Sequence, residues 1–127
     1  MRLRQTFKYY LPLSMCMKIS KETLLRINHG FGGDIRSNSS LDFALDKQND
    51  NKIGQYKKLA YLIRAILVDH PFSDGNKRTT MFVAFMFAEE NKKQVDRELL
   101  LHQIISIAKN NIQTIRNIEW RLKNAIR

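Results

Sequence analysis

The sequence predicts an all-α fold, a compact helical bundle around a central buried helix with a short β-hairpin beside it. Between residues 55 and 69, apolar side chains recur every three or four positions, which is the spacing of one helix face. Every residue from Met81 to Ala88 is apolar, and a helix that is apolar on all sides is typically buried. This second segment is therefore the expected central helix, and the glycine-rich residues 29–40 are expected to form a loop or a flexible hairpin.

The chain has the size and composition of one folded domain. Its 127 residues include 43% hydrophobic and 27% charged residues, close to the averages for globular proteins. The single cysteine, Cys16, excludes an internal disulfide and a Cys-rich zinc site. The longest apolar run is far shorter than the roughly 18 residues that cross a bilayer. We expect one domain over residues 1–127 in a reducing cytoplasm, with residues 1–17 as an N-terminal arm and no membrane partner.

Polar residues and a proline mark the helix ends in the first half of the chain. Ser20 is expected to cap the first helix, and Ser40 is expected to cap a second, short one. The polar stretch 46–54 predicts a loop. The next helix begins at Gln55 and ends before Pro71, because the residue that precedes a proline is disfavoured in a helix.

Three further helices are expected in the second half. The first is the apolar segment, which starts at residue 75 or 76 and runs to about residue 91. Asp96 is expected to cap the next helix, and the pair Asn110 and Asn111 to end it. Apolar residues spaced by three and four positions predict a last helix over residues 115–126, in which we expect Trp120 to pack against the core.

The chain is strongly basic, with a formal net charge of +10. Residues 1–50 carry 8 basic and 5 acidic side chains, residues 51–90 carry 6 and 4, and residues 91–127 carry 8 and 3. A basic protein can attract nucleic acid, nucleotides or an acidic partner. Because no segment forms a dense basic tail, we expect a charged surface on a folded body, and nucleic acid is not the favoured partner.

The stretch from His70 to Arg78 contains the residues that predict chemistry. It joins the helix of residues 55–69 to the expected buried helix. A helix N-terminus presents unpaired N–H groups and a positive dipole, and Gly75 allows an anion to approach that backbone closely. Arg78 lies in the first turn, where its guanidinium can bind the same anion, and Lys77 adds positive charge.

Two more side chains of this stretch suit phosphate chemistry. Asp74 is a carboxylate beside the anion site, and magnesium is usually held by one or two carboxylates together with substrate phosphates. His70 can act as a general base near neutral pH. The alternative is an ordinary turn in which His70 caps a helix and the two basic side chains are solvated.

The stretch resembles the signature of the Fic/Doc family, His-Pro-Phe-x-Asp/Glu-Gly-Asn-x-Arg. All seven fixed positions match, namely His70, Pro71, Phe72, Asp74, Gly75, Asn76 and Arg78. The size of the chain, its helical pattern and its glycine-rich loop also look like small Doc-type members. The resemblance implies a Fic/Doc-type helical bundle that transfers a phosphate-containing group from a nucleotide to a hydroxyl side chain of a target protein.

The resemblance also implies a role for each residue. His70 would deprotonate the incoming hydroxyl, Asp74 would hold Mg²⁺ against the phosphates of ATP, and Phe72 would anchor the turn in the core. The implied catalytic residues are His70, Asp74, Asn76 and Arg78, and the implied phosphate-binding residues are Gly75, Asn76, Lys77 and Arg78. A flap that aligns the target by strand-like pairing would consist of Gly32, Gly33, Asp34, Ile35, Arg36, Ser37 and Asn38.

Two positions differ from the family members that transfer AMP. Those members typically carry Gly after the Asn and a second Arg three residues past the first, where this chain has Lys77 and Met81. Lys77 and Arg78 together resemble the Doc branch, which is implied to transfer the terminal phosphate, although Pro71 and Gly75 are closer to the AMP-transferring members. We therefore expect phosphoryl transfer, with protein adenylylation as the alternative.

The resemblance further implies a toxin-like enzyme that acts on a translation factor or another essential protein. Some members carry an inhibitory Ser/Thr-x-x-x-Glu-Gly/Asn motif, whereas no Glu in this chain has Ser or Thr four residues earlier. Inhibition would then come from a second chain, the antitoxin of a toxin–antitoxin pair. The alternative of another class is a non-catalytic module that binds nucleic acid or protein, and nucleic-acid binding would require a continuous basic stripe.

Overall fold

Helices make up most of the described chain, and the all-α prediction is confirmed. The computed structural model describes residues 18–127, so the expected N-terminal arm and Cys16 lie outside the described residues. The elements of this part are α2 (Lys21–Gly30), α3 (Ser39–Asp46), the 3₁₀ helix η1 (Lys47–Asn49), α4 (Gln55–Asp69), α5 (Asn76–Glu90), α6 (Arg97–Lys109) and α7 (Ile115–Ala125). Within residues 18–127, each helix is too short or too polar to span a lipid bilayer.

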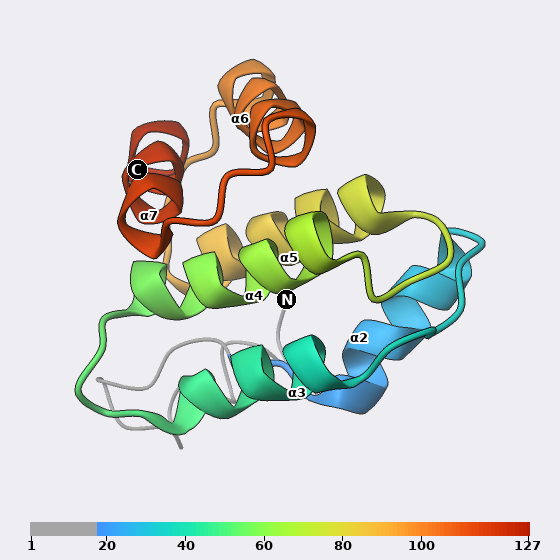
Figure 1. Ribbon diagram of the computed structural model, residues 1–127. Coiled ribbons are helices and arrows are strands. Elements are labelled where there is room, and N and C mark those ends of the chain that lie inside the picture. The colour runs from blue at the N-terminus through green and yellow to red at the C-terminus, as the bar shows by residue number, and fades with distance from the viewer. Residues whose placement is uncertain (1–17) are drawn as a thin grey trace, which may run out of the picture.

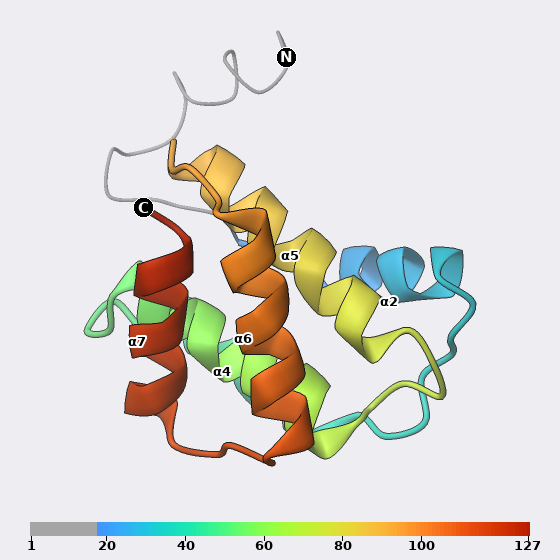
Figure 2. The ribbon, with the colours of Figure 1, turned by 90° about the horizontal axis from the view of Figure 1, so that it is seen from above.

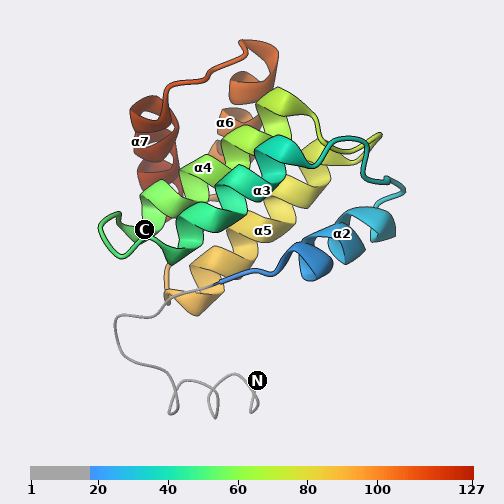
Figure 3. The same ribbon diagram turned by 60° about the horizontal axis from the view of Figure 1, so that its bottom comes forward.

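The helices are arranged in three layers (Figure 1). α4 and α5 form the middle layer, α6 and α7 lie on one side of it, and α2 and α3 lie on the other. Figure 2 shows the α6 and α7 side, and Figure 3 brings α2 and α3 forward. α4 packs against α3, α5, α6 and α7, so this middle-layer helix contacts helices of both outer layers.

The central helix is therefore α4, and the prediction that gave this place to the apolar segment of α5 is corrected. The buried residues of α4 are Leu59, Ala60, Leu62, Ile63, Ala65, Ile66 and Leu67. α5 also buries one face, but Phe82 on its other side is 46% exposed. The apolar run of α5 is wider than the surface that its neighbours cover, and the ring of Phe82 is left to contact Phe31 edge-on, at 6.2 Å between centroids.

Two of the expected helix caps are confirmed and one is not. The Ser20 hydroxyl accepts a hydrogen bond from the N–H of Thr23 at 3.1 Å, and the Asp96 carboxylate accepts one from the N–H of Leu99 at 3.1 Å. These bonds satisfy N–H groups that a helix start leaves unpaired. α3, in contrast, begins at Ser39 rather than after Ser40, and Asn38 precedes it without a side-chain cap.

Two other expectations are corrected by burial. The polar stretch 46–54 contains η1, and Gln48 within it is buried. Burial of this amide is compensated by two hydrogen bonds: its side chain donates to the carbonyl of Ile19 at 2.8 Å and accepts from the N–H of Ile19 at 2.9 Å. Trp120 is 64% exposed. α7 buries Ile118 and Leu122, and Trp120 lies halfway between them in sequence, so it projects from the opposite face of the helix.

The expected β-hairpin is not formed by the described residues. Ile35 instead makes an isolated antiparallel bridge with Phe72, which lies far along the chain. The N–H groups of Arg36 and Ser37 both donate to the carbonyl of Pro71, at 2.7 and 3.2 Å, and the N–H of Ser73 donates to the carbonyl of Asp34 at 2.9 Å. Within this segment, residues 34–37 pair with the turn before α5 rather than with each other, whereas residues 31–33 bond back to the last turn of α2.

Candidate active site

The turn between α4 and α5 is held by two residues with left-handed backbone conformations. His70 ends α4 at φ 50°, and Gly75 precedes α5 at φ 73°. Pro71 prevents α4 from continuing. At Gly75, a Cβ atom would lie only 3.1 Å from Cβ of Phe31, so both the conformation and the space favour glycine.

Buried contacts fix this turn to the body of the protein. Phe72 is 1% exposed and fills the core beneath the turn, as expected. The side-chain amide of Asn76 donates to the carbonyl of Phe72 at 3.1 Å, and the hydroxyl of Thr80 donates to the carbonyl of Asn76 at 2.9 Å. The start of α5 is therefore held from both sides, and its first residues have a defined direction.

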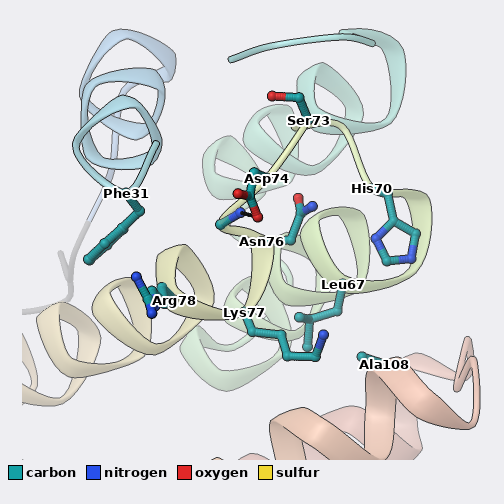
Figure 4. Close-up of a pocket in the computed structure, with 10 residues that line it drawn as sticks. Phe31, Leu67, His70, Ser73, Asp74, Asn76, Lys77, Arg78 and Ala108 are labelled. Carbon is teal, nitrogen blue, oxygen red and sulfur yellow. Dashed lines mark hydrogen bonds between the residues drawn. The ribbon is translucent and has the colours of Figure 1, made fainter. Parts of the chain in front are cut away.

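A cavity of about 350 Å³ opens at this helix start (Figure 4). It brings together all the predicted catalytic and phosphate-binding residues of the motif, and three residues from other segments complete its wall. The lining consists of Phe31, Leu67, His70, Ser73, Asp74, Gly75, Asn76, Lys77, Arg78 and Ala108. None of the predicted flap residues 32–38 lines the cavity. Three of them, Asp34, Arg36 and Ser37, form backbone hydrogen bonds with residues 71–73, next to the cavity wall.

The wall of the cavity is electropositive. Lys77 and Arg78 line it, and none of the ion pairs within residues 18–127 includes either side chain. The first N–H groups of α5 add the positive end of the helix dipole, and Gly75 contributes no side-chain cap that would occupy them. An anion is therefore the kind of ligand that this helix start can accept.

Asp74 is the acidic residue of the cavity wall. One oxygen of its carboxylate, Oδ1, accepts from the N–H of Gly75 at 2.7 Å, which orients the group, and no hydrogen bond or ion pair within residues 18–127 uses the second oxygen. No group of three or more His, Cys, Asp or Glu side chains within residues 18–127 could enclose a metal ion. A single exposed carboxylate fits a magnesium ion that is held mainly by water and substrate phosphates.

Sequence reasoning did not identify Asn28, which joins this turn to α2. Its side chain is fully buried, and Nδ2 donates both to the carbonyl of Asp74 at 2.8 Å and to the hydroxyl of Thr79 at 3.1 Å. A signal was present: Asn28 lies one turn after the buried Leu24, which places an amide on the apolar face of α2. Phe31, Leu67 and Ala108 gave no such signal, because they reach the cavity only through tertiary packing.

Taken together, the fold and the site define a class: an all-α protein with a histidine, a carboxylate and an arginine around an electropositive helix start. A comparison with protein families matches the Fic/DOC family over residues 10–88, and the chain belongs to that family. Proteins of this family are in general transferases that modify other proteins with a group taken from a nucleotide. Comparisons with curated proteins and with solved structures gave no match.

The matched region contains α2, α3, α4 and all but the last two residues of α5, and therefore every residue of the motif. α6 and α7 follow it, and Ala108 of α6 still lines the cavity. Nine of the ten lining residues therefore lie within the matched region, and Ala108 lies outside it.

Proposed function

We propose that this protein is a Fic-type transferase that moves a phosphate-containing group from ATP to a hydroxyl side chain of a target protein. One observation carries the proposal: His70, Asp74 and Arg78 line a single cavity at the start of α5. Separately, each could belong to an ordinary turn. Around one electropositive cavity they provide a base, a carboxylate for a metal and a cation for phosphate, which are the groups that this reaction requires.

His70 is the proposed general base. It accepts the proton of the incoming Ser, Thr or Tyr hydroxyl as the hydroxyl oxygen forms a bond to phosphorus. In phosphoryl transfer, the bond between the terminal phosphorus and the ADP oxygen breaks, and ADP leaves with that electron pair. Arg78, the side chain of Asn76 and the N–H groups at the start of α5 are proposed to bind the phosphate oxygens, and Lys77 contributes positive charge.

Asp74 is proposed to hold the Mg²⁺ that accompanies ATP. When bound, the ion neutralises part of the phosphate charge. The contribution of this chain is the orientation of the carboxylate, which the bond from the Gly75 N–H fixes. The backbone carbonyl of Asp74 accepts a hydrogen bond from Asn28, so both the backbone and the side chain of Asp74 are fixed.

We favour phosphoryl transfer over AMP transfer because of two side chains. Lys77, where AMP-transferring relatives typically carry Gly, lines the cavity and occupies space in it. Met81, where they carry a second Arg, packs half-buried against the core and offers no cation to a triphosphate. The test is mass spectrometry of candidate proteins, translation factors first, after incubation with ATP and Mg²⁺. An added phosphate supports the proposal, and an added AMP supports adenylylation.

The extended segment before α3 is the proposed place for the target. Its Asp34 and Arg36 pair with the turn, whereas no hydrogen bond within residues 18–127 uses the N–H or carbonyl of Ile35. A target strand could add to this free edge, next to His70. Replacing Ile35 with Pro removes that N–H. The change should raise KM for the target and leave ATP affinity unchanged.

We also propose that the enzyme is toxic when unregulated and that an acidic partner chain, an antitoxin, covers the site. The net charge of +10 and the two cations of the cavity wall, Lys77 and Arg78, would attract such a partner. The test is bacterial expression of the wild type beside His70→Ala. Growth arrest by the wild type alone, relieved by a neighbouring reading frame, supports the proposal. Equal growth contradicts the toxin role.

A further inference from the structure

We infer that Asn28 is a positioning residue. Its side-chain amide fixes the turn at Asp74 relative to Gly33, at the start of the predicted flap. The importance of Asp74 in this inference rests on the proposed function. Asn28 lies in the last turn of α2 and is fully buried, one turn after the equally buried Leu24. A hydrophobic residue would fill this place without the cost of removing an amide from water, so the amide calls for an explanation.

The first part of the explanation is where its donors point. Nδ2 donates to the carbonyl of Asp74, which precedes Gly75, and to the hydroxyl of Thr79, in the first turn of α5. One amide nitrogen thus spans the helix start and bonds to a residue on each side of it. Both the path of the chain into α5 and the position of Asp74 depend on these two bonds.

The second part concerns the flap. The carbonyl of Asn28 accepts from the N–H of Gly33 at 3.1 Å. A Cβ atom on Gly33 would lie 2.2 Å from the carbonyl oxygen of Asp74 and 2.3 Å from Oδ1 of Asn28. A Cβ atom on Gly75 would lie 3.3 Å from Nδ2 of Asn28. The Asn28 amide therefore fills the space between two glycines, one from the flap and one from the motif.

The third part is a cost that packing alone does not explain. Oδ1 of Asn28 is buried and has no hydrogen-bond partner within residues 18–127. Buried polar atoms are nearly always paired, and an unpaired one destabilises the folded state. The two hydrogen bonds donated by Nδ2 offset this cost, and both acceptors, the Asp74 carbonyl and the Thr79 hydroxyl, lie at the start of α5.

Asn28→Ala should consequently loosen the Asp74 turn more than it loosens the rest of the protein. Its matched control is Gln48→Ala. Gln48 is a second buried amide that makes two hydrogen bonds to a distant backbone, that of Ile19, and it does not line the cavity. Each variant loses one buried amide, so a general loss of stability affects both, and a positioning role affects only Asn28.

The experiment has two readouts. The first is hydrogen exchange of the free protein at the amides of Ser73 and Thr79, which bond across the turn and into the first turn of α5. The second is the ratio of ATP affinities with Mg²⁺ and with a chelator, measured by calorimetry. We expect Asn28→Ala to speed exchange at both amides several-fold and to lower the ratio several-fold, and we expect Gln48→Ala to do neither.

The outcomes separate the inference from the function on which it rests. Unchanged exchange in Asn28→Ala, or equal changes in both variants, overturns the positioning role. If the wild type shows no magnesium-dependent affinity, the proposed metal role of Asp74 fails, and the exchange data still decide the case of Asn28. Should Asn28→Ala not fold, Asn28→Ser takes its place, because its shorter hydroxyl cannot reach the Asp74 carbonyl, and the same two changes are expected.

Discussion

α5 and α6 both begin just after an aspartate, but the two carboxylates stand at different positions. Asp96 directly precedes α6, and its side chain accepts from the N–H of Leu99 inside the helix. Asp74 stands one residue further from its helix, with Gly75 between them, and it accepts from the N–H of Gly75 instead. A shift of one residue therefore separates an aspartate that closes a helix start from one that leaves the start open.

An uncapped start alone does not make a site. α3, α4 and α7 also begin without a side-chain cap. The first residue of α4, Gln55, lines a cavity of only about 10 Å³, which is about the space of a single water molecule. What distinguishes α5 is the conjunction of open N–H groups, a cavity of about 350 Å³ and the facing His70.

The largest expected difference between the two helix starts is the effect of replacing a histidine near each on transfer activity. His70→Ala should lower transfer by roughly 10²–10⁴-fold, the usual cost of losing a general base, and should leave ATP affinity and stability close to wild type. His102→Ala, at an exposed position of α6, should change none of these. Target modification is followed by mass spectrometry. Activity of His70→Ala within a few-fold of wild type would exclude His70 as the base.

The arginines of the two helix starts should differ next. Arg78→Ala should weaken ATP binding by roughly 10–100-fold, because a hydrogen bond to a charged group contributes about 1.5–3 kcal/mol. Arg97→Ala, in the first turn of α6, removes a cation that lies over the ring of Phe85 and should leave ATP affinity unchanged. Calorimetry with ATP and Mg²⁺ measures both, and equal losses would show that only the overall charge matters.

The two aspartates should give opposite results. Asp96→Ala should lower the free energy of unfolding by about 1 kcal/mol, the usual cost of losing a helix cap, and should not affect nucleotide binding. Asp74→Ala should abolish the effect of Mg²⁺ on ATP affinity. Denaturant unfolding and calorimetry on both variants provide the comparison. A variant at Asp74 that binds ATP with Mg²⁺ as tightly as the wild type places the metal elsewhere.

The smallest expected effect is that of salt. Raising the sodium chloride concentration should weaken ATP binding gradually, because screening reduces the attraction of exposed cations for phosphate. The bond between Asp96 and Leu99 lies within a single turn, so unfolding of Asp96→Ala relative to the wild type should respond little. Titrations over a salt series measure both trends. An ATP affinity independent of salt would argue against the cationic wall as the phosphate site.

The parts of this protein that the sequence predicts are those in which cause and effect lie close together along the chain. The residues from His70 to Arg78 form the turn after α4 and the first residues of α5, and the caps Ser20 and Asp96 act three residues away. The parts that it does not predict depend on contacts between distant segments. Asn28 meets Asp74 across 46 positions, and Ile35 pairs with Phe72 where a local hairpin was expected.

Burial shows the same limit within single helices. The apolar run of α5 predicts burial on all sides, yet how much is covered depends on where the neighbouring helices end, and Phe82 remains exposed. Trp120 has the chemistry of a core residue, but Ile118 and Leu122 form the face of α7 that packs into the protein core, and Trp120 lies on the other face. Residue type alone therefore does not determine which face a helix turns inward.

The position of Ala108 has a consequence for the design and divergence of this site. The motif residues come from one turn, but the wall that faces Lys77 includes a methyl group from α6, outside the region of the family match. Larger side chains at position 108 would make the cavity shallower without changing any residue of the motif. A change at position 108 could therefore alter the size limit of the site while the motif and its chemistry are kept.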